Sequence, residues 1–144
     1  MKKRSVALTA GAGLLACAGM AGFASSASAA TNGAVPLNSY QYTMHTDDGD
    51  PGGVVQFAPS GDYVHLKDIE ADGWAVHLSV TDATTGKHKY SIQVGGKNRY
   101  IDRSATMGSE YNLAENHIIK FTICLAKSGH KLSYCDTSKW GNSE

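Results

Sequence analysis

The sequence predicts an all-β protein: a single antiparallel β-sandwich of about seven strands, joined as a meander of hairpins and carrying one disulfide. Three observations lead to this fold class. Apolar and polar residues alternate with a period of two along most of the chain, no segment shows helical periodicity, and glycine-containing turns separate the alternating runs. An antiparallel strand that buries one of its faces produces this alternation.

The first 29 residues are predicted to be a Sec signal peptide and not part of the folded domain. Basic residues at 2–4 precede an uncharged run, 6–23, and the small residues that end at Ala29 suit signal peptidase. Cys17 lies in this run within a loose lipobox, so lipidation of that cysteine is the alternative. The signal peptide predicts a secreted, extracellular protein in an oxidising environment.

Cleavage after Ala29 leaves 115 of the 144 residues, which is enough for one domain with a single core. This mature part has 10 basic and 13 acidic residues, hence a net charge near −3. Such a balance argues against a nucleic-acid-binding surface. No second apolar stretch approaches the roughly 20 residues that a membrane-spanning helix needs.

An N-terminal leader is predicted to precede the sandwich. Residues 30–44 contain Asn32, Gly33 and Pro36 and show no periodicity, which indicates a flexible segment. The sandwich domain would then occupy residues 45–144.

Three short turns, 59–62, 71–73 and 84–86, each contain a glycine and lie between two alternating runs. In each case the turn length sets apolar residues opposite apolar residues, so turn chemistry and core parity agree on the register. The predicted cross-strand pairs are Val55 with Leu66, Phe57 with Val64, Leu66 with Leu78, Val64 with Val80, Val80 with Tyr90, Leu78 with Ile92, and Val76 with Val94.

Two features that follow are less regular. Asp68 and Glu70 fall on the core side of their strand, so either the pairing ends near Lys67 or a bulge turns these residues away. Farther on, a strand is expected near 99–103, with a register that the sequence leaves open. The segment 104–116 is a connection long enough to cross between two sheets.

Cys124 and Cys135 are predicted to form a disulfide, because paired cysteines in an exported chain usually form bridges; a redox or metal pair is the alternative. The segment 128–131 has glycine at the first central position of a two-residue turn. In that register the cysteines lie opposite each other and Leu125 faces Tyr134, whereas a turn longer by one residue would make the cysteines diagonal. Closing so short a loop with a disulfide stabilises the folded state by roughly 3 kcal/mol.

The acidic segment that contains Asp47, Asp48 and Asp50 is the most prominent polar cluster. Calcium binding is one interpretation, because hard cations are bound by several oxygens from a tight turn, but the ligand spacing of an EF-hand is absent. A solvated turn is favoured. Glu70 and Asp72 lie in another loop and complete an acidic site only if the fold brings the two loops together.

His65 and His77 are predicted to point outward from adjacent strands as diagonal neighbours, roughly 7 Å apart between Cα atoms. Two such ligands can share a zinc ion, but no third ligand is placed, so neither a metal site nor a cofactor is predicted. The Gly-x-Ser-x-Gly motif of serine hydrolases is absent, and the acidic residues of 68–72 are typical of an ordinary loop. A non-enzymatic function is therefore predicted.

Carbohydrate binding is a further alternative, since aromatic rings on a β-sandwich can stack on sugars. Tyr63 and Tyr100 are expected to face outward, Trp140 lies near the C-terminus, and Trp74 shares the parity of the core residues. Because parity does not establish that rings are coplanar, core packing or surface cover is favoured for each ring.

The mature chain resembles, over essentially its whole length, a group of small secreted proteins that recur in streptomycete-type actinobacteria. The resemblance is carried by the signal peptide and by Asp50-Pro-Gly-Gly53, Asp68-Ile-Glu-Ala-Asp-Gly-Trp74, Ile123-Cys-Leu-Ala-Lys-Ser-Gly129, Tyr134-Cys-Asp136 and Trp140. It implies a compact all-β fold and an extracellular location, and it implies no catalytic residues. In size, export and fold type the chain is also similar to the small adaptor subunit of actinobacterial umbrella-shaped toxin particles, which joins a lectin-like subunit to a large toxin subunit.

These observations predict a secreted, non-enzymatic protein-recognition module with an extracellular protein partner, such as an adaptor in a secreted assembly. A rigid, disulfide-bonded β domain presents loops and one sheet face to a partner. The alternatives are a secreted peptidase inhibitor, a small extracellular hydrolase and a glycan-binding module. The candidate binding residues are His65, Lys67, His77, Asp47, Asp48, Asp50, Glu70 and Asp72.

Overall fold

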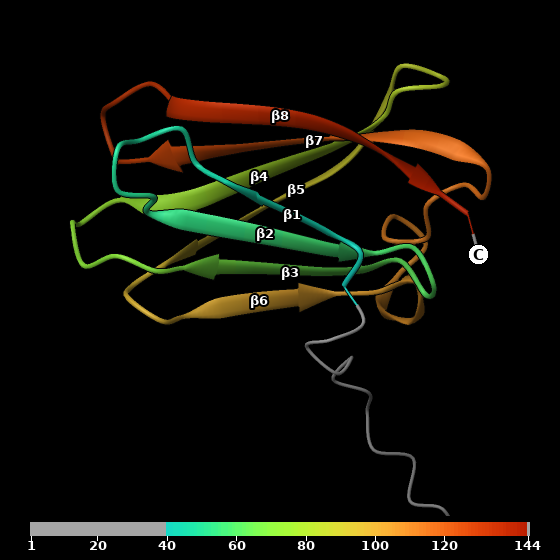
Figure 1. The fold of residues 1–144 in the computed structure, drawn as a ribbon, viewed down its shortest axis with the longest axis horizontal. Helices are drawn as coiled ribbons and strands as arrows, with labels where there is room; N and C mark the ends of the chain where they lie inside the picture. The colour runs from blue at the N-terminus through green and yellow to red at the C-terminus, as the bar shows by residue number, and fades with distance from the viewer. Residues whose placement is uncertain (1–39, 144) are drawn as a thin grey trace, which may run out of the picture. The chain divides into compact units, whose positions relative to one another are not determined.

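The structure is a computed structural model that describes residues 40–143. The predicted signal peptide, Cys17 and most of the predicted leader lie outside the described residues. Within them, eight strands form two antiparallel sheets of four strands each, and this confirms the predicted all-β sandwich (Figure 1).

Sheet A has the strand order β1-β2-β3-β6, and sheet B has the order β5-β4-β7-β8. The sheets pack face to face, so β1 lies near β8 at one side and β6 lies near β5 at the other. The elements are β1 (Tyr42–His45), β2 (Gly53–Ala58), β3 (Tyr63–Asp68), β4 (Ala75–Asp82), β5 (Lys87–Gly95), β6 (Tyr100–Arg103), the short 3₁₀ helix η2 (Ala105–Met107), β7 (His117–Ala126) and β8 (Ser133–Asn142).

The first strand, β1, was not expected from the sequence. It pairs with β2 and places Met44 opposite Val55, so residues 42–44 belong to the domain and not to the leader. Met44 is the one buried side chain of this four-residue strand, and one buried residue produces no alternation to detect.

Two predicted hairpins are confirmed at the level of register. Phe57 lies opposite Val64 in the β2–β3 pair, and Leu78 lies opposite Ile92 in the β4–β5 pair. The inward side chains of these strands are buried, as the alternation requires. Where two consecutive strands are neighbours in one sheet, local turn chemistry and core parity therefore give the correct register.

The third predicted hairpin, between β3 and β4, is wrong. Leu66 does not pair with Leu78, because β3 pairs with β2 and β6 while β4 pairs with β5 and β7. The chain instead crosses from sheet A to sheet B between Asp68 and Ala75, and the two leucines are both fully buried in the core between the sheets. Strands in both sheets bury one face, so alternation contains no information on which sheet a strand joins.

Asp68 is the last residue of β3, and its carboxylate is buried on the core side of the strand. It is 1% exposed. Its carboxylate accepts hydrogen bonds from the backbone N–H groups of Glu70 (3.1 Å) and Gly96 (2.7 Å). Two charge-assisted bonds compensate for the loss of water and join the β3–β4 connection to the β5–β6 turn.

An aromatic cluster, formed by Tyr42, Phe57, Phe121 and Trp140, fills the interface between the sheets. The ring centroids of Phe57 and Phe121 are 4.9 Å apart, and those of Phe121 and Trp140 are 4.8 Å apart. Tyr42 stacks on Trp140 at 5.1 Å. We call these four residues the core aromatic cluster. Trp140 is therefore a packing residue.

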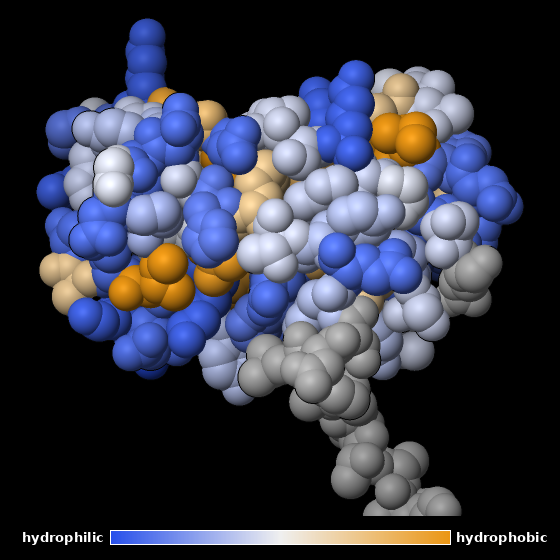
Figure 2. Space-filling view, in the orientation of Figure 1, coloured by the Kyte–Doolittle hydropathy of each residue, from blue (hydrophilic) through white to orange (hydrophobic). Residues whose placement is uncertain are grey.

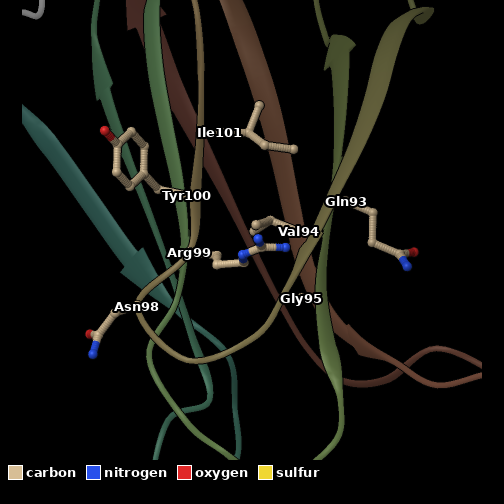
Figure 3. Close-up of a pocket in the computed structure, with 7 residues that line it drawn as sticks. All are labelled: Gln93, Val94, Gly95, Asn98, Arg99, Tyr100 and Ile101. Carbon is tan, nitrogen blue, oxygen red and sulfur yellow. The ribbon is translucent and has the colours of Figure 1, made fainter.

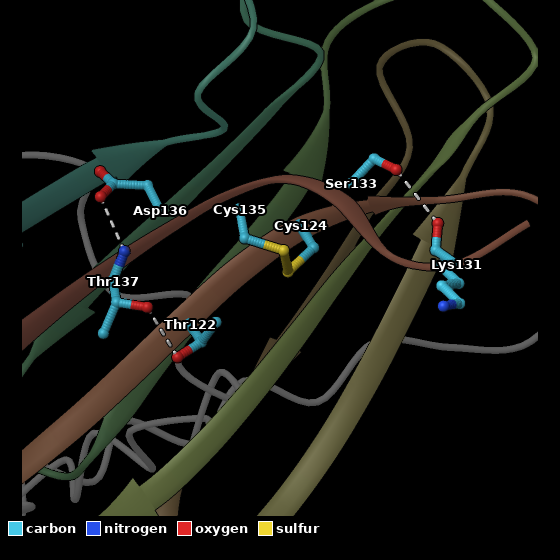
Figure 4. The surroundings of a disulfide bond; sticks show 7 residues. All are labelled: Thr122, Cys124, Lys131, Ser133, Cys135, Asp136 and Thr137. Atoms are coloured by element: carbon cyan, nitrogen blue, oxygen red, sulfur yellow. Dashed lines mark hydrogen bonds between the residues drawn. A yellow bond between two sulfur atoms is a disulfide. The ribbon is translucent and has the colours of Figure 1, made fainter.

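The predicted disulfide between Cys124 and Cys135 is present and joins β7 to β8 (Figure 4). The predicted two-residue turn is wrong: the strands are joined by residues 127–132, and Leu125 faces Ser133 instead of Tyr134. Between that pair and the next, Cys124 faces two residues of β8, which makes a β-bulge. Tyr134 absorbs the extra residue with a positive φ of 50°.

Candidate functional site

The structure distributes the predicted site residues over three surfaces. His65 and Lys67 are on β3 and face outward from sheet A, whereas His77 is on β4 and faces outward from sheet B. The predicted diagonal contact between His65 and His77 is therefore wrong, and its cause is the same misplaced β3–β4 hairpin. The acidic residues lie in the connections at one end of the sandwich.

Three rings follow one another across the outer face of sheet A. His65 lies between Tyr40, at a centroid distance of 6.0 Å, and Tyr100, at 5.2 Å. Tyr100 comes from β6 and is 60% exposed. We call Tyr40, His65 and Tyr100 the aromatic strip.

A short hydrogen bond holds the central ring of the strip. His65 Nδ1 is 2.6 Å from Asp102 Oδ1, and the two residues lie directly opposite each other on β3 and β6. The pair fixes the orientation of the imidazole ring. Next to it, partial burial, followed by the negative charge of Asp102 and the neighbouring Tyr63, raises the pKa of Tyr40, so the Tyr40 hydroxyl stays protonated.

Lys67 and Tyr100 are cross-strand neighbours on the same face. The outer face of sheet A thus combines two tyrosine rings, a histidine held by Asp102 and a cation. Figure 2, in the orientation of Figure 1, shows a surface that is largely hydrophilic or intermediate, with small separate hydrophobic areas. Tyrosine and histidine each combine an apolar ring with a polar group, so the strip is amphipathic.

The fold does bring the two acidic loops together, as an acidic site requires. Burial, followed by a side-chain hydrogen bond with Asp50 and the charges of Asp50, Asp72 and Asp48, raises the pKa of Glu70 above its ordinary value. We call Asp48, Asp50, Glu70 and Asp72 the acidic cluster. Asp47 is anchored separately, because its backbone N–H donates to the Tyr134 carbonyl oxygen at 3.0 Å.

The acidic cluster does not form a set of metal ligands. Within residues 40–143, no three His, Cys, Asp or Glu side chains are grouped closely enough to hold a metal ion. One oxygen of Asp48, Oδ2, instead accepts a hydrogen bond from the backbone N–H of Gly52 at 3.0 Å. This contact closes the turn that leads into β2 and favours its interpretation as a solvated turn.

Replacing Glu70 by glutamine is expected to raise the melting temperature at pH 7. The raised pKa means that the folded state binds this proton more tightly than the unfolded state does. Ionised Glu70 therefore opposes folding, and this effect develops as the pH rises from the ordinary value of 4.5 through the raised pKa. Thermal melts of wild type and Glu70→Gln at several pH values should diverge at neutral pH and converge in acid.

Glu115→Gln is the matched control for this experiment, because Glu115 is exposed and lies outside the acidic cluster. Its melting curve should follow the wild type at every pH. A lower melting temperature of Glu70→Gln than of wild type at pH 7 would show that ionised Glu70 stabilises the fold, contrary to this interpretation.

Histidine–carboxylate pairs occur twice, and neither is joined to a nucleophile among the described residues. Besides His65–Asp102, His117 Nδ1 lies 2.8 Å from Asp82 Oδ2. Burial alone would raise the pKa of Asp82, but hydrogen bonds from His117 and Thr85 outweigh it and lower the pKa to about 2. This carboxylate also accepts backbone hydrogen bonds in the turn after β4, so its role is structural.

One serine approaches a histidine. Ser91 Oγ is 3.5 Å from His88 Nε2, at the limit of a hydrogen bond, and both residues are exposed on β5. No carboxylate of the described residues orients His88. The two histidine–carboxylate pairs and the serine–histidine pair thus lie at three separate places, and the described residues do not bring them together as a Ser-His-Asp triad.

Sequence reasoning missed Tyr40 and Asp102 as members of the sheet A surface. Tyr40 was placed in the leader, and Asp102 lies on the strand for which no register was available. Parity within β6 puts Asp102 on the face that Tyr100 occupies, so the alternation held a usable signal. The contact with His65 depends on the β3–β6 pairing, which connects residues far apart in the chain.

No helix within residues 40–143 is long and apolar enough to cross a membrane. The chain matches no protein-family model and no curated protein sequence. The resemblance to small secreted actinobacterial proteins and to the adaptor subunit therefore stays a prediction.

Proposed function

We propose that this protein is a secreted, non-enzymatic protein-recognition module that binds an extracellular protein partner through the outer face of sheet A. Secretion is supported by the signal-peptide pattern of the sequence and by the Cys124–Cys135 disulfide, a bond typical of oxidising compartments. The binding role is supported by the composition and geometry of the aromatic strip.

The observation that carries the proposal is the exposure of Tyr100 beside His65 and Lys67. Tyrosine is enriched in the residues that dominate protein–protein affinity, because it buries a large ring and keeps a polar tip. Asp102 holds His65 in place, so the central ring loses little conformational freedom on binding. A partner would thus meet a pre-ordered group of rings bordered by a cation.

Ring geometry favours a protein partner over a glycan. The Tyr40 and His65 rings are tilted by 42°, and those of His65 and Tyr100 by 33°. Sugar platforms use coplanar rings, whereas rings that pack against protein groups also adopt tilted and edge-to-face arrangements. Within this function, an adaptor in a secreted assembly is our preferred role, and a peptidase inhibitor differs from it in the partner that would be captured.

Affinity capture of the tagged protein in native culture supernatant, with Tyr100→Ala beside wild type, tests the proposal. We expect wild type to retain a stoichiometric protein and Tyr100→Ala to bind that protein about 30-fold more weakly, which is the effect of losing a dominant interface tyrosine. Tyr134→Ala is the matched control, since Tyr134 is 54% exposed on β8 of the other sheet. Equal capture by Tyr100→Ala, or no captured protein at all, would contradict the proposal.

A further inference from the structure

The sandwich is open along part of the side where β5 and β6 lie. Each of these strands is the edge of its sheet. Over one half of this side, the connection after β6 covers the opening: Tyr111 packs edge-on against Tyr90 at 4.9 Å, and Leu113 is buried. Over the other half, no described segment covers the two edges, and a groove remains.

This groove has a volume of about 520 Å³ and is lined by both edge strands and the turn that joins them. Figure 3 shows Val94 and Ile101 pointing into the space between β5 and β6, while Tyr100 and Gln93 point away to the two outer faces. Val94 is 8% exposed, whereas its neighbour Val76 on β4 is 0% exposed. The floor of the groove is therefore apolar, with Val94 buried and Ile101 partly buried.

The segment that contains the groove is rich in basic residues compared with the rest of the described part of the chain. Residues 87–103 contain five of the ten basic residues of the described part but one of its twelve acidic residues, Asp102, which is bonded to His65. These basic residues are Lys87, Lys89, Lys97, Arg99 and Arg103.

Arg99 is the basic residue that lines the groove itself. Its guanidinium extends into the space between the strands (Figure 3), and no described residue forms an ion pair or a side-chain hydrogen bond with it. By contrast, Arg103 lies over the ring of Tyr111 at 5.2 Å, and Lys89 donates to the carbonyl oxygen of Asn112. The groove thus presents a planar, bidentate cation that has no partner among the described residues.

We propose that this groove binds an extended acidic peptide segment of a partner protein, which pairs with the free edge of β5 and places a carboxylate on Arg99. Strand addition to an exposed edge draws affinity from main-chain hydrogen bonds and specificity from alternate side chains. One side of the added strand would cover Val94 and Ile101, and an acidic side chain would reach Arg99. The uncovered part of the β5 edge is its C-terminal end, where Gln93, Val94 and Gly95 line the groove.

Lysines on an edge strand also protect against aggregation, and this accounts for Lys87 and Lys89. It does not account for Arg99, which precedes β6 and is directed into the groove. The groove shares Tyr100 with the aromatic strip, but its floor and Arg99 lie outside the strip. Binding of an acidic peptide there therefore goes beyond the function assigned to the strip.

The test uses a short synthetic peptide in which valine alternates with glutamate, titrated into isotope-labelled protein and followed by the amide resonances. We expect the shifts to be confined to β5 and residues 96–101. A peptide with glutamine in place of glutamate, and the Arg99→Ala protein with the original peptide, should each bind about tenfold more weakly, as the loss of one charge-assisted pair predicts.

Two further variants make the result specific. Lys139→Ala removes an exposed cation from β8, the opposite edge of sheet B, and should leave the affinity unchanged. Tyr40→Ala removes a ring of the aromatic strip that does not line the groove and should also leave peptide binding unchanged, so the two proposals can fail separately. Equal binding of the glutamine peptide, no binding of either peptide, or shifts confined to other strands would overturn the inference. Binding of single-stranded DNA with the same loss in Arg99→Ala would assign the groove to nucleic acid and overturn it as well.

Discussion

Phe57→Ala is expected to lower the free energy of unfolding by about 3 to 5 kcal/mol, the range measured when a buried phenylalanine is truncated. Phe57 is fully buried and its ring contacts three other members of the core aromatic cluster. Because these neighbours come from both sheets, the cavity would lie at the contact that holds the sandwich together. A loss of this size is a large share of the total stability of a small domain.

Urea unfolding measures this effect, with intrinsic fluorescence as the probe because Trp140 lies in the same cluster. Phe57→Leu is the matched control; it keeps most of the apolar volume and should cost less than about 1.5 kcal/mol. If Phe57→Ala cost no more than Phe57→Leu, the neighbouring rings would have closed the cavity, and the cluster would be less rigid than the geometry indicates.

Removing the disulfide, by Cys124→Ala together with Cys135→Ala, is expected to cost about 3 kcal/mol of unfolding free energy by the chain-entropy relation. The cysteines are 11 positions apart, so the bridge closes a short loop at the end of the β7–β8 hairpin. The same hairpin contains the bulge at Tyr134, whose carbonyl oxygen accepts the backbone hydrogen bond from Asp47. The acidic loop should therefore also become more exposed to proteolysis.

A neighbouring cross-strand pair provides the control. The hydroxyl groups of Thr122 and Thr137 are 3.0 Å apart on the same pair of strands (Figure 4), so the double change to valine removes a contact without removing a covalent loop. Such a pair contributes less than about 1 kcal/mol. Equal losses from the threonine and cysteine pairs would show that the bridge acts as an ordinary contact and does not restrict the unfolded chain.

The candidate site was partly predictable, and the reason differs from residue to residue. Parity alone placed His65 and Lys67 on an outer face, because the alternation of β3 is local and regular. Parity could not place His65 beside Asp102, since that contact needs β3 and β6 to be neighbours. It likewise could not show that Asp50 and Glu70 meet, because their loops are brought together by the crossing between the sheets.

The same distinction holds for the fold. The β2–β3 and β4–β5 registers follow from the sequence, because each turn joins the two strands that pair and both signals lie within one short segment. The β3–β4 pairing does not follow, because a strand of either sheet buries one face and produces the same alternation. Strand β1 and the bulge at Tyr134 were missed for a related reason. Each is set by pairing with a neighbouring strand over only a few residues, which leaves no repeating pattern in the sequence.

What the sequence by itself determined is the fold class, the two regular hairpins, the disulfide partners and the outward orientation of His65, Lys67 and Tyr100, all of which depend on local alternation or on a unique pair of cysteines. What only the tertiary structure decided is which strands share a sheet, and with it the aromatic strip, the acidic cluster and the groove beside Arg99. These surfaces form where segments distant in the chain meet, and burial of a common core supplies the free energy that brings those segments together. Many strand orders would bury the same apolar residues, so the local pattern does not choose among them.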